Sequence, residues 1–314
     1  MTPPLIFDRS LVRARRRRAS RMGPQTFLLD QVAGELAQRL RLVVRRFDVA
    51  VDLGTPAAAL RRAVMADGAI GAMIAVDPVI TESRGDDDPA RFAVAADEEA
   101  LPFADGSLDL VVSALSLQAV NDIPGALAQV RRALKPDGLF LAALLGGDTL
   151  CELRASFAAA ESELEGGVSP RVAPFAGVRE MGALLQRAGF ALPVTDVDRI
   201  TVRYSSPLRL FHDLRSMGAG NVLVARRRTP LRRATLMRAM AVYGERFADP
   251  DGKVRATFDV VFLSGWSPHE SQQQPLRPGS AKARLADALG TTETRIRDDV
   301  GGKIGGKIGG KAER

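Results

Sequence analysis

Cysteine, histidine and long apolar runs are all scarce in this sequence of 314 residues. Because Cys151 is the single cysteine, an internal disulfide framework is excluded and a reducing compartment is favoured; we expect the thiol to be a small apolar helix side chain. The longest apolar stretch, GLFLAALLGG, is much shorter than the roughly 20 residues of a membrane-spanning helix. The Arg-rich start lacks the apolar segment of a secretory signal. We therefore expect a cytoplasmic protein, with a position at the inner face of a membrane as the alternative.

The sequence also offers few metal ligands. His212 and His269 are far apart along the chain, and neither belongs to a His-x-Asp or His-x-Glu pair. Iron(II) oxygenases commonly hold their metal with two histidines and one carboxylate. The sequence therefore predicts no metal site, and we expect His269 to be a hydrogen-bonded structural residue.

Positive charge is unevenly distributed. The net charge is +7, and much of the excess lies in one N-terminal cluster and in a glycine-rich tail. The cluster comprises Arg13, Arg15, Arg16, Arg17, Arg18 and Arg21. No recognition-helix or zinc-finger pattern accompanies it, so specific nucleic-acid binding is not predicted. Three interpretations of the cluster stay open: a solvated helix end, a docking arm for an acidic partner or membrane surface, or a transit peptide.

Strands and helices alternate through the first half of the chain. The apolar runs are continuous, which favours a parallel sheet covered on both faces over a half-exposed antiparallel one. The strands are expected at 47–54, 71–77, 91–97, 107–117 and 138–146, and the helices at 25–40, 56–67 and 123–134. The turn sequence Lys135-Pro136-Asp137-Gly138 is expected to end the last of these helices.

After residue 148 the pattern becomes mostly helical. Helices are expected at 149–164, 177–190, 207–218 and 229–247, and strands at 198–204 and 257–266, the strands forming an antiparallel pair at the sheet edge. Four segments result: a basic arm and helix (1–46), a nucleotide-binding core (47–147), a part that completes the sheet and faces a partner or substrate (148–281), and a low-complexity tail (282–314). We expect the tail to be disordered.

Acidic residues end three of the expected strands. Ligands of parallel sheets bind at the carboxyl ends of the strands, where Asp52, Asp77 and Asp97 all fall. An acid at the end of the second strand can accept both hydroxyls of a ribose, and Asp97 could hold an exocyclic adenine amine. The alternative is that each is a solvated loop residue. Together they predict a nucleoside-binding edge.

The order of segments resembles that of class I S-adenosylmethionine-dependent methyltransferases. More specific stretches, FDRSLVRARRRRA, GGDTLCELR and GWSPHESQ, resemble the methyltransferase-fold assembly factors of respiratory complex I, which are associated with arginine hydroxylation. The resemblance covers about residues 6–281 and implies a Rossmann-like sheet, mostly parallel, with helical additions. It also implies S-adenosylmethionine as cofactor and a protein substrate, such as a complex I subunit. The implied cofactor residues are Asp52, Gly54, Asp77, Asp97, Glu98 and Ser113.

The loop after the first strand departs from this family. Where the family usually has Asp-Leu-Gly-Cys-Gly-x-Gly, this chain keeps Asp52 and Gly54 but has Thr55, Pro56 and Ala58. Glycine allows close approach of a ligand to the backbone, whereas proline has no N–H to donate. A methyltransferase with weaker cofactor binding and a non-catalytic assembly scaffold are therefore both open. A third alternative is a small-molecule enzyme like the malonyl-carrier-protein methyltransferases, against which the C-terminal motifs argue.

No catalytic side chain is predicted, since the sulfonium of the implied cofactor is a good leaving group and positioning does most of the work. Ser113, Gln118, Asn121 and Asp122 follow or end the fourth strand and are candidates to line the substrate mouth. Capping of the next helix is the alternative role for Asn121 and Asp122.

Overall fold

The computed structural model describes residues 5–79, 88–273 and 290. Contacts divide the chain into two units, Met1–Glu270 and Ser271–Arg314, and the helices and strands described below belong to the first. Both expected internal boundaries, after residues 46 and 147, fall within this unit. The expected low-complexity tail, 282–314, lies outside the described residues apart from Gly290.

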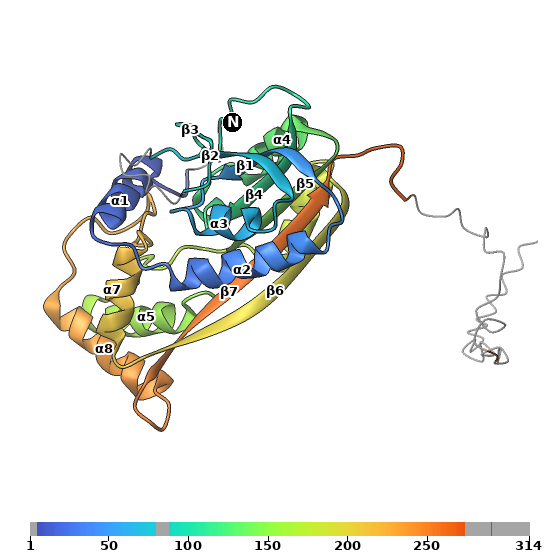
Figure 1. Cartoon of the computed structure of the whole chain (residues 1–314). Helices are drawn as coiled ribbons and strands as arrows, with labels where there is room; N and C mark the ends of the chain where they lie inside the picture. The colour runs from blue at the N-terminus through green and yellow to red at the C-terminus, as the bar shows by residue number, and fades with distance from the viewer. Residues whose placement is uncertain (1–4, 80–87, 274–289, 291–314) are drawn as a thin grey trace, which may run out of the picture. The chain divides into compact units, whose positions relative to one another are not determined.

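A seven-stranded sheet forms the centre of the first unit (Figure 1). Its strand order is β3-β2-β1-β4-β5-β7-β6. The strands are β1 (Phe47–Leu53), β2 (Ile70–Val76), β3 (Phe92–Val94), β4 (Leu108–Ala114), β5 (Leu134–Leu145), β6 (Ala191–Tyr204) and β7 (Val254–Trp266). The strands from β3 to β5 pair in parallel, and β7 is antiparallel to both β5 and β6. The predicted, mostly parallel methyltransferase-type sheet is confirmed, with β7 lying one position inside the edge strand β6.

Helices cover both faces of the sheet (Figure 1). On one face, α2 and α3 pack through Leu36 and Leu60; on the other, α4 and α6 pack through Leu127 and Leu185. A third cluster joins α5, α7 and α8 to β7 around Tyr243. The helices are α1 (Arg9–Arg21), α2 (Phe27–Arg41), α3 (Ala59–Met65), α4 (Ile123–Ala133), α5 (Cys151–Glu165), α6 (Val178–Arg187), α7 (Pro207–Ser216) and α8 (Arg233–Phe247). Among the described helices, none is long and apolar enough to cross a membrane.

The turn sequence before the fifth strand behaves differently from the expectation. Strand β5 begins at Leu134, directly after α4, instead of at residue 138. The register slips at this point, because Leu108 pairs with Leu134 while Leu110 pairs with Leu139. The expected turn is therefore looped out within the strand, with Asp137 at φ +63°. Lys135 Nζ fixes the loop by donating to both carboxylate oxygens of Asp109, each at 2.9 Å.

Candidate functional site

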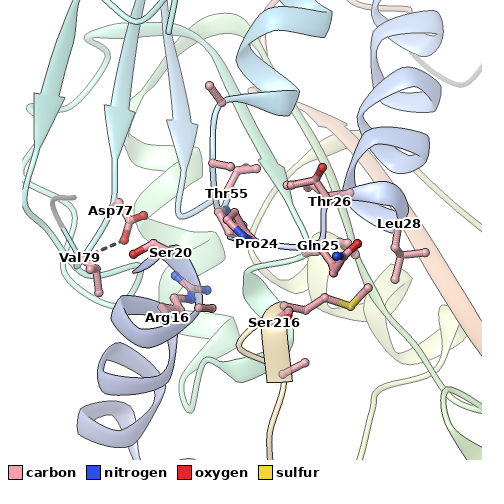
Figure 2. Close-up of a pocket in the computed structure, with 18 of the residues that line it drawn as sticks. Arg16, Ser20, Pro24, Gln25, Thr26, Leu28, Thr55, Asp77, Val79 and Ser216 are labelled. Atoms are coloured by element: carbon pink, nitrogen blue, oxygen red, sulfur yellow. Dashed lines mark hydrogen bonds between the residues drawn. The ribbon is translucent and has the colours of Figure 1, made fainter. Parts of the chain in front are cut away.

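A cavity of about 420 Å³ lies beside the carboxyl ends of β1 and β2 (Figure 2). Its volume falls in the range of about 300–1,000 Å³ that small-molecule sites occupy. The walls come from segments far apart in the sequence: the C-terminal half of α1, the start of α2, the loop after β1, the ends of β2 and β3, and α7. The cavity is thus formed by the edge of the sheet at which the sequence predicted a nucleoside.

The register of β1 and β2 brings Asp77 to this cavity. Leu53 pairs with Val76, and Gly54 N donates to Val76 O at 2.7 Å, so the loop after β1 starts next to Asp77. Asp77 Oδ1 accepts a hydrogen bond from Val79 N at 2.7 Å (Figure 2). Burial raises the pKa of the Asp77 carboxyl above its usual value. Of the six implied cofactor residues, Asp77 is the one that lines the cavity.

Asp52 lies behind the cavity wall. It is fully buried, and its Oδ2 accepts from Arg61 Nη1 at 2.6 Å. Arg61 also donates to both oxygens of Asp88, through Nε at 2.9 Å and Nη2 at 2.7 Å. Burial raises the pKa of Asp52 to about 6, against the opposing charge of Arg61. Arg61 and Asp88 line the cavity. Asp52 does not line it, and acts on it only through its ion pair with Arg61.

The loop after β1 has a glycine-type backbone at two positions. Gly54 has φ +69°, and a Cβ at this position would lie 2.3 Å from Ser116 Oγ and 2.4 Å from Glu98 Oε1. Ala57 also adopts the left-handed region, with φ +62°, although it has a side chain. Thr55 is buried and its Oγ1 accepts from Ala114 N at 2.9 Å, which anchors the loop to β4. The loop therefore forms its turn with one glycine, Gly54, among residues 54–58.

Glu98 is the centre of a buried ion-pair network. Its side chain is fully buried, and Oε1 accepts from Ser116 Oγ at 2.5 Å and from Arg16 Nη1 at 3.3 Å. Oε2 accepts from Arg9. Both arginines belong to α1, so Glu98 fastens the N-terminal helix to the loops that follow β3 and β4 and does not line the cavity.

Asp97 also pairs with arginines of α1. Its two oxygens accept from Arg9 Nη2 at 2.7 Å and Arg13 Nη2 at 3.1 Å. Burial alone would raise its pKa, but the Glu99 N–H and the Arg9 guanidinium hold the pKa below its usual value. Asp97 is therefore a charged ion-pair partner that does not line the cavity, and the contact with an adenine amine expected for it stays a prediction.

Of the candidates for the substrate mouth, one lines the cavity and the others do not. Ser113 is buried, and its Oγ donates to Leu53 O at 2.7 Å, tying β4 to β1 instead of facing the cavity. Gln118 does line the cavity, with its Nε2 donating to Leu115 O at 2.8 Å. Gln118 is thus the mouth candidate that the structure brings to the site.

Asn121 and Asp122 have structural partners. Asn121 Oδ1 accepts from the backbone N–H groups of Ile6 and Phe7, at 2.9 and 2.8 Å, and so holds the N-terminal segment. Asp122 caps α4, accepting from Gly125 N at 2.8 Å. Neither side chain is among those that line the cavity.

The contribution of α1 is what the sequence reasoning missed. Asp8 caps this helix by accepting from Leu11 N at 3.0 Å. Arg9, Arg13 and Arg16 then recur at the spacing of one helix face, and that face meets Asp97 and Glu98. The exposed arginines are Arg17, Arg18 and Arg21. The i, i+4, i+7 spacing of Arg9, Arg13 and Arg16 was the sequence feature that could have indicated this face. The docking arm considered for the cluster is compatible only with the exposed arginines.

The histidines lie apart from this cavity. His212 is an exposed residue of α7, with its Nδ1 at 3.5 Å from Asp213 Oδ1, and His269 follows β7. In the described part of the chain, no three His, Cys, Asp or Glu side chains gather in a way that could hold a metal ion. Cys151, half-buried at the start of α5, is the single cysteine of the sequence.

Known proteins share this fold. Residues 48–142 match the family model described as a methyltransferase domain. A crystal structure of a Bacillus halodurans protein with a provisional methyltransferase name superposes with a TM-score of 0.50 at 14% identity, covering 74% of this chain and 99% of that one. The chain is thus a class I methyltransferase-fold protein.

Sequence relatives narrow the assignment. The human protein named arginine-hydroxylase NDUFAF5, mitochondrial, is 41% identical over 287 residues, which cover 90% of this chain and 83% of the relative. Its Danio rerio namesake is 38% identical over 288 residues, covering 90% and 89%. The malonyl-[acyl-carrier protein] O-methyltransferase of Laribacter hongkongensis is 34% identical over 293 residues, covering 89% and 96%. This chain belongs to the NDUFAF5 family.

These names correct one expectation. The sequence alone predicted a cytoplasmic location, from the single cysteine and the absence of a signal. The human and Danio rerio relatives are both named mitochondrial, which contradicts that prediction. A low cysteine content reports a reducing environment, which several compartments share, so it could not separate them.

Proposed function

We propose that this chain binds S-adenosylmethionine in the cavity at the ends of β1 and β2, and that it acts on or holds a protein subunit of respiratory complex I during assembly. The observation that carries the proposal is the meeting of Asp77 and the loop after β1 at a cavity of about 420 Å³. Family membership supports the protein partner, since the human relative is named an arginine-hydroxylase.

The residues present fit this cofactor. Asp77 stands where a carboxylate can accept the ribose hydroxyls. Val79, Ala93 and Val94 give an apolar wall next to it, suited to the flat adenine ring. The loop from Thr55 to Ala58 borders the remaining space, which leaves room for the amino-acid part. When bound, the cofactor supplies an electrophilic methyl group; the chain orients it and shields it from water.

A non-catalytic scaffold is the second candidate. The proline in the loop favours it, because Pro56 cannot donate a backbone hydrogen bond. The ion pairs between α1 and the acids at the end of β3 suit a scaffold as well, since they rigidify this edge whether or not a ligand is present. The two candidates differ in one measurable property, which is cofactor affinity.

Calorimetry on protein refolded to remove carried-over ligand separates them. We expect micromolar binding of S-adenosylmethionine by the unaltered chain, and a loss of about 10- to 100-fold in Asp77→Ala, as expected when hydrogen bonds to a charged group are removed. Asp105→Ala is the matched control, because Asp105 is an exposed acid that pairs with the surface residue Arg132. Absence of binding up to millimolar concentrations would contradict the enzyme candidate and leave the scaffold.

A further inference from the structure

Arg16 is the α1 arginine that reaches the cavity. Its side chain is 12% exposed and lines the cavity next to Asp77 (Figure 2). The guanidinium is fixed at the root of the altered loop, because Nη1 donates to Gly54 O at 3.3 Å and Nη2 donates to Ser116 Oγ at 3.1 Å. A helix far from the loop in sequence thus brings a cation to the point where the loop begins.

The contact with Glu98 does not occupy all the N–H donors of Arg16. Glu98 takes its closest contacts from Arg9 and from Ser116, and the Arg16 contact is the longer one at 3.3 Å. A guanidinium has five N–H donors in a planar fork, which suits an additional carboxylate. Burial raises the pKa of the Asp77 carboxyl, and the Val79 N–H and the positive charge of Arg16 act against that rise.

The loop itself is short of donors. The amino-acid part of S-adenosylmethionine ends in a carboxylate, which needs N–H donors when it leaves water. A glycine-rich loop supplies them from its backbone, but Pro56 has no N–H, so this loop has one backbone donor fewer. Arg16 lies at the same end of the loop and faces the same space.

We propose that Arg16 binds the carboxylate of the cofactor's amino-acid part and replaces the donor that the loop lost at Pro56. This inference rests on the proposed function and specifies which residue of α1 completes the site. It makes the Arg-rich helix a component of the binding site through one of its faces. Charge-assisted pairing of this kind is stronger than a neutral hydrogen bond, so one side chain can offset one missing backbone donor.

Two ligands that differ in the carboxylate test the proposal on the full chain. S-adenosylhomocysteine has the amino-acid part, and 5′-methylthioadenosine lacks it. In Arg16→Met we expect affinity for S-adenosylhomocysteine to fall about 10- to 100-fold, and affinity for 5′-methylthioadenosine to stay within about twofold. Arg17→Met, on the exposed face of the same helix, is the control and should leave both affinities unchanged.

The second ligand also reports whether the variant folds. If both ligands weaken equally in Arg16→Met, Arg16 only holds α1 in place and the carboxylate role is wrong. Retention of S-adenosylhomocysteine affinity would overturn the role as well. If the unaltered chain binds neither ligand, the proposed cofactor function itself fails and this inference fails with it. A deficit confined to S-adenosylhomocysteine supports both.

Discussion

Gly54 is the position where the loop after β1 tolerates a side chain least. Its φ of +69° costs an L-residue about 1–2 kcal/mol. A Cβ would also lie 2.3 Å from Ser116 Oγ and 2.4 Å from Glu98 Oε1, which are fixed in the buried network. Overpacking of this kind adds about 1–3 kcal/mol. Gly54→Ala should therefore lower the free energy of unfolding by about 2–5 kcal/mol.

Gly68 provides the matched control. Its φ is +68°, nearly the same, but apart from its two chain neighbours no described residue would have an atom within 4 Å of a Cβ at this position. Gly68→Ala should cost the backbone strain alone, about 1–2 kcal/mol. Urea unfolding of both variants, compared at unchanged slope, gives the difference. Equal losses would refute the reasoning, because they would mean that Ser116 and Glu98 do not pack under Gly54.

Two further substitutions test the same region. Ala57 has φ +62° and a side chain, so Ala57→Gly should raise the free energy of unfolding by about 1 kcal/mol, seen as a higher urea midpoint; an unchanged or lower midpoint would argue against the strained turn. Burial raises the folded-state pKa of Asp52 from 3.8 to about 6, so its contribution to stability is complete below about pH 3.8 and is lost as the pH rises through about 6. That difference corresponds to about 3 kcal/mol, and Asp52→Asn should gain up to that amount relative to the unaltered chain between about pH 4 and pH 7. Unfolding curves at about pH 4 and pH 7 give the difference in free energy of unfolding between Asp52→Asn and the unaltered chain. The same difference at both pH values would contradict the raised pKa of Asp52.

The central strands were predictable because continuous burial leaves a clear pattern in the sequence. Strand β4 is buried at every position, and a continuous apolar run of this length is typical of a sheet covered on both faces. Strand β6 was predicted too short, because as the edge strand it exposes Leu192, Val194 and Val197 and has no clear alternation. The start of β5 was misjudged for a local reason: Lys135–Gly138 has turn chemistry, and the strand accommodates it as a looped-out segment.

The site was only partly predictable, since strand ends follow from topology but side-chain partners do not. Asp77 is one residue beyond β2, and parallel register alone brings it to the loop after β1. Asp97 and Glu98 also follow a strand, yet arginines more than 80 residues earlier in the chain pair with them. No feature of the sequence near Asp97 indicates that Arg9 is its partner. A search for charged stripes at helical spacing would have been the better guide.

The loop after β1 and helix α1 meet at Arg16, which donates to Gly54 O. The family resemblance implied glycines where this chain has Pro56 and Ala58, and predicted weaker cofactor binding from that difference. Its backbone has positive φ values at Gly54 and Ala57, and the turn they form borders the cavity. Pro56 has no N–H to donate, and a donor can come from elsewhere in the fold. If Arg16 provides it, cofactor affinity depends on α1 being docked, and linkage requires the cofactor to stabilise that docking by the same free energy.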